Sequence, residues 1–264
     1  MRTVASPDGT RIAFWRSGGG PPLLLVHGAS ADHTTTWQLV RPELERRFTV
    51  YALDRRGRGG SGDAPVYELS REAEDIAAVV DGIGGPVDVL GHSHGALCAL
   101  EAALLTPNVR RLILYEGVPL RGADDFEPGA VERLEATLRT GDVEGVLVGL
   151  LRDIVRMPRE EIEHLRAQTE SWQVRLSNAR TVPRELRVYA QYTFATERFE
   201  ALSIPTLLLV GEDSPARERA SAAQVAATLP DARVEVLPRQ QHVAMHTAPD
   251  LFVSEVERFF SAAQ

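Results

Sequence analysis

Residues 88–97 read Asp88-Val89-Leu90-Gly91-His92-Ser93-His94-Gly95-Ala96-Leu97 and are the most informative part of this chain. An apolar run ends at Gly91, a serine stands between two glycines, and small residues of helical character follow. This Gly-X-Ser-X-Gly order is typical of a sharp strand-to-helix turn that exposes the serine hydroxyl at the end of a sheet. Glycines suit the turn because the serine backbone is strained and leaves little room for side chains. Ser93 is therefore a candidate nucleophile; the alternative is an ordinary turn with a solvent-exposed serine.

The bulk composition is that of a globular protein. The chain has 264 residues, 44% of them hydrophobic, which suits one large α/β domain with a substantial core. A net charge of −8 argues against nucleic acid or an anionic membrane as the partner. All 29 basic residues are arginine, so lysine nucleophiles and Schiff bases are excluded.

The single cysteine excludes an intrachain disulfide. Cys98 lies in the apolar run Ala96–Leu105, as a small buried core residue would. Cysteines and histidines do not cluster at metal-ligand spacing, so we expect no metal. The first residues lack a basic segment followed by an apolar one, and no stretch approaches the length of a membrane span. We expect a cytoplasmic protein, and its oligomeric state (monomer or homodimer) stays open.

Short apolar runs alternate with helical patterns along most of the chain. Thr3–Ser6 and Arg11–Arg16 flank an Asp-Gly turn and predict a hairpin. Continuous apolar runs, typical of strands buried on both faces, occupy Leu23–Val26, Phe48–Leu53, Val87–Leu90, Leu112–Tyr115, Thr206–Val210 and Val234–Leu237. Helical patterns occupy Glu68–Asp81, Ala96–Leu105, Ala216–Thr228 and Pro249–Ala262. The alternation predicts a mainly parallel sheet covered by helices on both sides.

This alternation stops between about Val118 and Ser203. Helical patterns without a convincing strand fill the interval, at Ala130–Thr140, Val143–Val155, Arg159–Thr169 and from Pro183 to about Tyr192. We interpret the interval as a helical cap inserted between two strands of the sheet. The predicted organisation is a core made of residues 1–117 and 204–264, with a cap made of residues 118–203.

A serine nucleophile needs a base, a carboxylate that orients the base, and donors for the oxyanion. The base candidate is His242, in a loop beyond the last expected strand, and His246 competes for the role. His92 and His94 flank the serine, but their side chains should point away from its hydroxyl. His94 matters through its backbone N–H, which together with that of Ala29 is the candidate oxyanion hole.

These residues together resemble the α/β-hydrolase fold superfamily, in its lidded esterase, C–C hydrolase and peroxidase-like branch. His27-Gly28 is similar to the family's oxyanion-strand motif, Asp54–Ser61 to its Asp-X-Arg-Gly-X-Gly-X-Ser turn, and Gly91–Gly95 to its elbow. His242, with Pro249 seven residues later, matches the spacing around the family's histidine and is favoured over His246. The resemblance covers essentially the whole chain and implies an eight-stranded, mostly parallel sheet with an inserted cap. We expect a structural role for the Asp54–Ser61 turn.

The carboxylate departs from the family's pattern. The resemblance implies an aspartate after the seventh strand, but Gly211-Glu212-Asp213-Ser214-Pro215 places Ser214 at that position. Asp213 from a shifted loop is one candidate, and its alternative use is to cap the following helix. Glu116, directly after the strand Leu112–Tyr115, is the other candidate. We favour Glu116, because a carboxylate at the end of a buried strand needs a partner.

The favoured function is a serine hydrolase that cleaves a small carboxylic ester, thioester or lactone through an acyl-enzyme on Ser93, without a cofactor. The resemblance also leaves open acyl transfer, C–C bond hydrolysis, lyase chemistry and a non-catalytic small-molecule receptor. Either way the expected partner is a small molecule.

The residues expected to contact that molecule lie mainly in the cap. Candidates for the roof of its pocket are apolar or aromatic, namely Leu147, Leu150, Leu151, Trp172, Leu176, Tyr189 and Phe194. Trp37, after the oxyanion loop, is a further candidate, and each of these residues has core packing as its alternative. Arg175 and Arg180 either bind an acidic group or face water.

Overall fold

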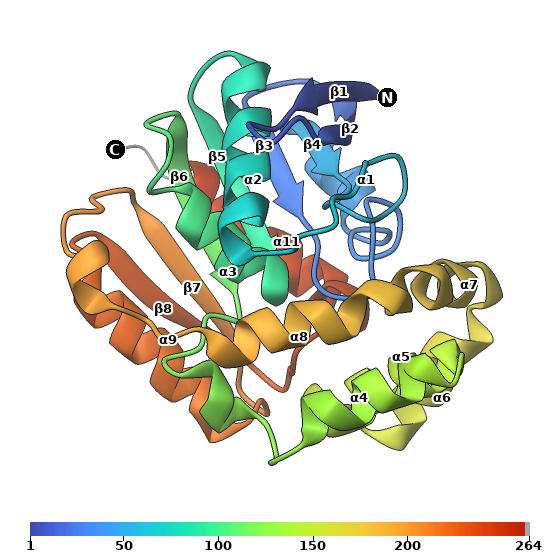
Figure 1. The fold of residues 1–264 in the computed structure, drawn as a ribbon. Helices are drawn as coiled ribbons and strands as arrows, with labels where there is room; N and C mark the ends of the chain where they lie inside the picture. The colour runs from blue at the N-terminus through green and yellow to red at the C-terminus, as the bar shows by residue number, and fades with distance from the viewer. Residues whose placement is uncertain (262–264) are drawn as a thin grey trace.

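The computed structural model describes residues 1–261 and contains an eight-stranded sheet with helices on both faces (Figure 1). The strand order is β1-β2-β4-β3-β5-β6-β7-β8. β2 pairs antiparallel with β1 and β4, and the other neighbours pair parallel. The strands are β1 Arg2–Ala5, β2 Arg11–Gly18, β3 Pro22–Val26, β4 Thr49–Leu53, β5 Val87–His92, β6 Val109–Tyr115, β7 Thr206–Gly211 and β8 Ala232–Leu237.

The central strands are buried on both faces, as their continuous apolar runs predict. Successive side chains of a strand point to opposite faces, so Leu24 joins one core cluster and its neighbour Leu25 joins the other. β4, β5 and β7 are buried along their whole length. The prediction of a mostly parallel, eight-stranded sheet flanked by helices is confirmed.

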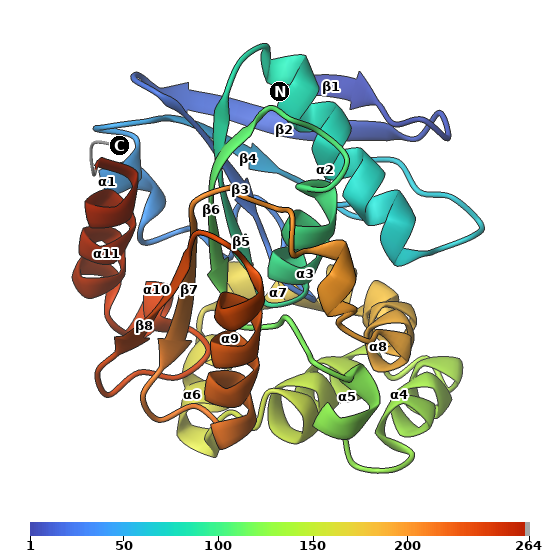
Figure 2. The same ribbon diagram turned by 90° about the vertical axis from the view of Figure 1, so that its left-hand side faces the viewer.

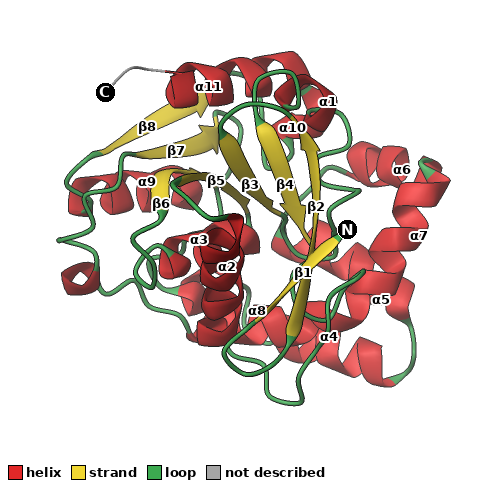
Figure 3. Cartoon of the chain, turned by 90° about the horizontal axis from the view of Figure 1, so that it is seen from above, coloured by secondary structure: helices red, strands yellow, loops and turns green. Residues whose placement is uncertain are grey.

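Helices outside the inserted segment cover the two faces (Figure 3). One face is covered by α2 (Leu69–Ile83), α3 (His94–Ala102) and α9 (Ala216–Thr228). The other is covered by α1 (Arg41–Leu44), α10 (Ala244–Thr247) and α11 (Pro249–Ser261). Ala262, the expected last residue of α11, lies outside the described residues. Within residues 1–261 no helix combines the length and apolar character needed to cross a membrane.

Five α-helices stand between β6 and β7, where the cap was expected. They are α4 (Ala130–Arg139), α5 (Val143–Gly149), α6 (Arg159–Ala167), α7 (Thr169–Asn178) and α8 (Val182–Gln191), called the inserted helices below. Their buried side chains form a core cluster of their own. The pattern over Val143–Val155 proves to be α5 followed by a π-helical turn, Leu150–Ile154. A separate helix at α7 was not expected. Figure 2 shows α4, α5, α6 and α8 grouped at one end of the sheet.

The carboxyl ends of the parallel strands gather the sequence motifs at one edge of the sheet. His27 follows β3, Ser93 follows β5, and Glu116 follows β6. Ser214 and His242 lie in the loops that follow β7 and β8. Because ligands of open parallel sheets bind outside the carboxyl ends of the strands, this edge is where a site is expected.

Candidate active site

Ser93 occupies a strained turn between β5 and α3. Its backbone has φ 54° and ψ −130°, and its N–H donates to the Tyr115 carbonyl over 3.0 Å. The flanking glycines are required by close packing. A Cβ at Gly95 would lie 2.4 Å from the His27 carbonyl oxygen, and one at Gly91 would lie 2.7 Å from the Ala96 Cα. The turn therefore has the backbone of a nucleophile elbow, with its serine at the start of a helix.

A third glycine supports the elbow from outside the motif. Gly117 has φ +88°, and a Cβ there would lie 2.4 Å from both the carbonyl carbon and the carbonyl oxygen of Ser93. The chain after β6 is thus pressed against the backbone of the serine. This contact couples the position of Ser93 to that of Glu116, the residue before the glycine.

Gly117→Ala should therefore lower stability and turnover more than the same replacement at a glycine with open space around it. Gly141→Ala is the matched control, because Gly141 has φ +83° and open space where its Cβ would be. Both variants carry a left-handed backbone cost of about 1–2 kcal/mol. Gly117→Ala adds a clash worth about 1–3 kcal/mol. Urea denaturation and ester turnover measure both effects, and equal losses in the two variants would contradict this packing argument.

His242 is paired with Glu116. The imidazole Nδ1 lies 2.6 Å from Oε2 of Glu116, whose side chain is almost fully buried. The other oxygen, Oε1, accepts the Ser214 hydroxyl over 2.6 Å and the Gly211 N–H over 2.9 Å. Ser214 stands after β7, where the family pattern places its acid. Its hydroxyl instead donates to the carboxylate of Glu116, which follows the neighbouring strand β6.

Asp213 is not brought to the histidine. Its side chain is exposed, and its backbone N–H donates to the Gln240 carbonyl over 2.9 Å. The cap position of α9 is Pro215, without a side-chain cap, so Asp213 does not cap that helix either. Between the two carboxylates that the sequence left open, the geometry favours Glu116.

The pairing changes the proton affinity of both groups. Burial disfavours a charged imidazole, but the hydrogen bond and negative charge of Glu116 outweigh it and raise the pKa of His242 above 6.5. Burial also opposes ionisation of Glu116, but His242, Ser214 and the Gly211 N–H together lower its pKa. Glu116 is therefore a carboxylate at neutral pH, suited to fix the imidazole with its proton on Nδ1.

This predicts the acid limb of the pH profile. A histidine acts as a base only in its neutral form, so activity is lost as the pH falls through its pKa. Because that pKa is raised, kcat/KM for an uncharged ester should fall with an inflection above pH 6.5. Initial rates from pH 5 to 9, with circular dichroism to show that the protein stays folded, measure it. An inflection below 6.5 would contradict the assigned pairing.

The other histidines near Ser93 are neutral. Burial lowers the pKa of His92 well below its usual value, and its Nε2 lies 2.8 Å from the His242 carbonyl oxygen. Burial also lowers the pKa of His94, whose Nε2 lies 3.1 Å from the Tyr67 hydroxyl. Burial and the charge of Arg175 lower the pKa of His246 to about 4. Among these rings, only that of His242 is paired with a carboxylate.

The loop after β3 packs directly on the nucleophile. A Cβ at Gly28 would lie 3.0 Å from the Ser93 Cβ, and Ala29 lines the same cavity as Ser93 and His94. The Gly28 carbonyl accepts from Arg58 over 2.9 Å and from Arg55 over 3.2 Å. These arginines belong to the Asp54–Ser61 turn, which thereby holds the loop, as its expected structural role requires. The first N–H groups of a helix, such as that of His94, have no acceptor within the helix.

One cavity joins these groups. Its empty volume is about 1060 Å³, the open mouth included, and both Ser93 and His242 line it. The apolar wall comes from the segment after α5 and from α6, through Leu150, Leu151, Ile154, Val155, Met157 and Leu165. The remaining wall comes largely from α8, from the start of α9, from the segment after β8 and from the loops that hold Ser93 and Ala29. A strained serine and a carboxylate-paired histidine thus face one largely apolar cavity with an open mouth.

Comparison with known proteins decides the family. A family model described as "Alpha/beta hydrolase family" matches residues 23–255. The chain belongs to the alpha/beta hydrolase family. A solved alpha/beta hydrolase from Sphaerobacter thermophilus is 37% identical, with a TM-score of 0.85 over 98% of this chain and 100% of that one.

Two curated relatives of this alpha/beta hydrolase have named activities. A 2-(acetamidomethylene)succinate hydrolase from Mesorhizobium japonicum is 26% identical over 93% of this chain and 90% of its own length. A pimeloyl-[acyl-carrier protein] methyl ester esterase from Nitrosomonas europaea is 28% identical over 90% and 95% respectively. The relatives thus span nearly the whole chain and include a hydrolase and an esterase.

The structure places only some of the expected ligand contacts of this family member at the cavity. Tyr189, Leu150 and Leu151 line the cavity, but Trp37, Leu147, Trp172, Leu176 and Phe194 do not. Trp37 is fully buried in the core cluster that includes α11, and Leu147 and Trp172 lie in the core of the inserted helices. A helical apolar pattern identifies buried faces, but it does not say which face meets a cavity rather than another helix.

Several charged cavity residues were missed by sequence reasoning. The Nε of Arg217 lies 3.8 Å from Asp125 and 3.6 Å from Glu218. Burial and the nearby charge of Glu116 raise the pKa of Glu218. The helical pattern of α9 does not indicate that its first turn lines the cavity. Of the two arginines considered, Arg175 lines the cavity and Arg180 is exposed.

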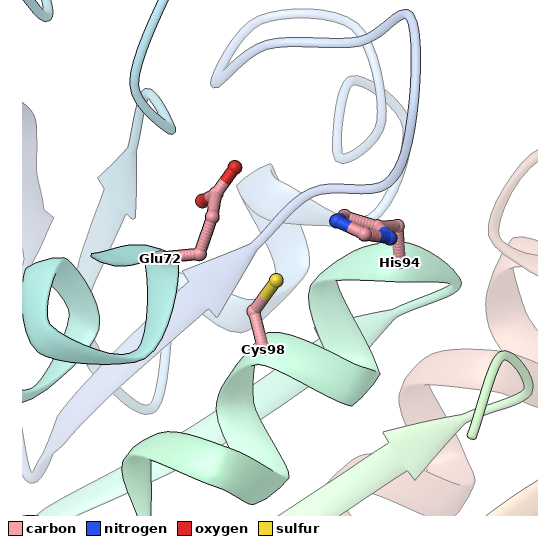
Figure 4. A group of neighbouring side chains, drawn as sticks. All are labelled: Glu72, His94 and Cys98. Atoms are coloured by element: carbon pink, nitrogen blue, oxygen red, sulfur yellow. The ribbon is translucent and has the colours of Figure 1, made fainter. Parts of the chain in front are cut away.

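Two clusters of metal-ligand residue types occur within residues 1–261. Glu72, His94 and Cys98 lie on α2 and α3 behind the elbow (Figure 4). Arg55 donates to both oxygens of Glu72, over 2.7 and 3.1 Å, and burial raises the pKa of the Cys98 thiol. A cation there would meet a guanidinium and a protonated thiol, so the donor set does not suit a metal.

The second cluster is Asp32, His33 and Asp54. Its carboxylates are engaged by protein donors. Asp54 accepts from the His33 ring and the Gly60 N–H over 2.8 Å each, and Asp32 accepts from Thr34 and Thr35. These carboxylates hold loops, and we assign no metal to them.

Proposed function

We propose that this protein hydrolyses a small carboxylic ester, thioester or lactone through an acyl-enzyme on Ser93. The observation that carries the proposal is that Ser93 on its strained turn and His242, paired with Glu116, line one cavity. Membership of the alpha/beta hydrolase family and the named activities of its relatives support hydrolysis over binding alone.

The mechanism follows from the two ring nitrogens of His242. Glu116 occupies Nδ1, so Nε2 is the nitrogen available to take the proton of Ser93 as its oxygen attacks the acyl carbon. The N–H groups of Ala29 and His94 stabilise the negative oxygen of the tetrahedral intermediate. His242 then protonates the leaving group, and a water activated by the same nitrogen releases the acyl group from Ser93. No cofactor takes part.

We further propose that residues 118–203 act as a cap over a core formed by residues 1–117 and 204–264. The cap supplies the apolar wall of the cavity, and Tyr189 contacts the substrate from α8. The Tyr189 hydroxyl is held by Asp125 over 2.8 Å, which fixes its ring at the cavity wall. A largely apolar wall favours a substrate whose acyl or alcohol part is apolar next to the reacting bond.

The test is to trap the covalent intermediate. The protein is treated with a fluorophosphonate probe, and separately with a slowly hydrolysed nitrophenyl ester, and its peptides are analysed by mass spectrometry. One adduct on the peptide that carries Ser93, formed at the rate of inactivation, is expected. Turnover without an acyl adduct would support proton-transfer chemistry instead, and tight ligand binding without turnover would support a receptor.

A further inference from the structure

Arg175 is a buried guanidinium at the wall of the candidate active site. It lies on α7, is only 8% exposed and lines the cavity that contains Ser93. Its Nε has no hydrogen-bond partner, and among residues 1–261 no carboxylate lies within ion-pair distance of it. A buried charge is costly unless it is paired, so this arrangement needs an explanation.

The other charges at the cavity wall each have an opposite charge within 4 Å, although the Nε of Arg217, like that of Arg175, has no hydrogen-bond partner. Glu116 is bonded to His242, and Arg217 lies near both Asp125 and Glu218. Glu185 forms ion pairs with Arg55, over 3.3 Å, and with Arg58. Arg175 therefore differs from its neighbours in having no counter-ion of its own within the described part of the chain.

Arg175 nevertheless stays positively charged. Burial lowers its pKa to about 10, well above neutral pH. The carboxylate whose charge acts on it is Asp32, and the Oδ1 of that group already accepts from the backbone and side chains of Thr34 and Thr35. The charge of Arg175 also contributes to the lowered pKa values of His246 and His92, which line the cavity together with Ser93 and His242. The cavity wall thus carries a positive charge that no carboxylate of residues 1–261 contacts directly.

A guanidinium in a largely apolar cavity is suited to one kind of ligand group. Its planar fork of N–H donors matches the two oxygens of a carboxylate, and the interaction is strong where water is excluded. The protein as a whole carries a net charge of −8 and does not attract anions through its overall field. Recognition of an anion would therefore need a cation in the cavity itself, and Arg175 is favoured over Arg217 because Arg217 already has two carboxylates within 4 Å.

We propose that Arg175 binds a carboxylate carried by the substrate, so that the compound hydrolysed is the monoester, thioester or lactone of a dicarboxylic acid. The nature of the bond that is cleaved rests on the proposed function, whereas carboxylate binding at Arg175 stands on the cavity alone. The apolar part of the cavity lining suits the methylene groups that separate the carboxylate from the reacting carbonyl.

The kinetic test compares two esters with acyl chains of equal length, 4-nitrophenyl hydrogen glutarate and 4-nitrophenyl pentanoate. The wild-type protein should prefer the glutarate ester. Arg175→Gln should lower the ratio of the two kcat/KM values by about 10- to 100-fold, as expected for a charged hydrogen-bonded pair. Arg180→Gln, which changes an exposed arginine of the same segment, should leave the ratio as it is. Equal losses on both esters in Arg175→Gln would overturn the proposal.

Binding is measured separately, so that failure of hydrolysis does not decide the question. Glutarate is titrated by calorimetry into Ser93→Ala and into the double variant Ser93→Ala/Arg175→Gln. Binding that requires Arg175 upholds the proposal even if neither ester is hydrolysed, in which case only the proposed function fails. No ester preference together with no glutarate binding overturns it. Thermal melting checks folding, and Arg175→Gln should melt no lower than wild type, since it removes an unpaired buried charge.

Discussion

Ser93→Ala should lower kcat for ester hydrolysis by about 10⁴- to 10⁶-fold and abolish labelling by a fluorophosphonate. Only the hydroxyl group is removed. The strained turn is held by close backbone packing at His27, Ala96 and Gly117, which does not involve that hydroxyl. The variant should therefore stay folded. Stopped-flow and long-time assays of one nitrophenyl ester, with a parallel thermal melt, separate loss of chemistry from loss of structure.

Ser30→Ala is the matched control. Ser30 is a buried serine that lines the same cavity, and it has the same φ of 54° as Ser93. Ser30 stands outside the Gly-X-Ser-X-Gly turn, so Ser30→Ala should keep most of the activity and all of the labelling. Turnover by Ser93→Ala at more than about one hundredth of the wild-type rate would remove the acyl-enzyme from the mechanism.

Glu116→Gln is expected to lower kcat by about 10⁴-fold. Ser214 and the Gly211 N–H both donate to Oε1 and so hold the amide oxygen of the glutamine at that position. The amide NH₂ must then face His242 Nδ1, which becomes an acceptor and leaves the imidazole proton on Nε2. That nitrogen can no longer take the proton of Ser93. The residual activity should also lose the raised inflection of the pH profile, because the negative charge that raises the pKa of His242 is gone.

Asp213→Asn is the control for this prediction. Asp213 is exposed, and its backbone N–H, which the substitution keeps, donates to the Gln240 carbonyl. Its replacement should change kcat/KM by less than about twofold, as for most surface substitutions. Wild-type activity in Glu116→Gln together with an inactive Asp213→Asn would reverse the assignment of the acid.

Much of the fold could be predicted because it is encoded locally. The continuous apolar runs at β3, β4 and β5 mark strands that are buried on both faces, and the break in alternation marks the inserted helices. The boundaries of α7 and the π turn after α5 could not be predicted. Both depend on how the inserted helices pack on one another, and a periodic pattern in one segment does not contain that information.

The parts of the candidate site that a short stretch of sequence specifies could be predicted, and those that depend on distant segments could not. The turn at Ser93 needs particular residues within a few positions, so its motif is legible in one stretch of sequence. Trp37 and Trp172 are aromatic residues of the kind that contact ligands, yet they are core residues. The sequence does not separate the two roles, because an aromatic side chain shows the same pattern whether it contacts a ligand or another helix. Glu218 left no signal, because a helical pattern does not indicate that the first turn of α9 lines the cavity.

The sequence by itself determined the parallel sheet, the strained serine turn and the histidine that follows the last strand. Each is specified by residue types at short separation, where backbone sterics and burial act directly. Only the tertiary structure decided that Glu116 pairs with His242, that Ser214 supports it, and that Arg175 lines the cavity without a partner. Those relations join groups far apart in the chain, and the way the loops converge at one edge of the sheet sets their distances.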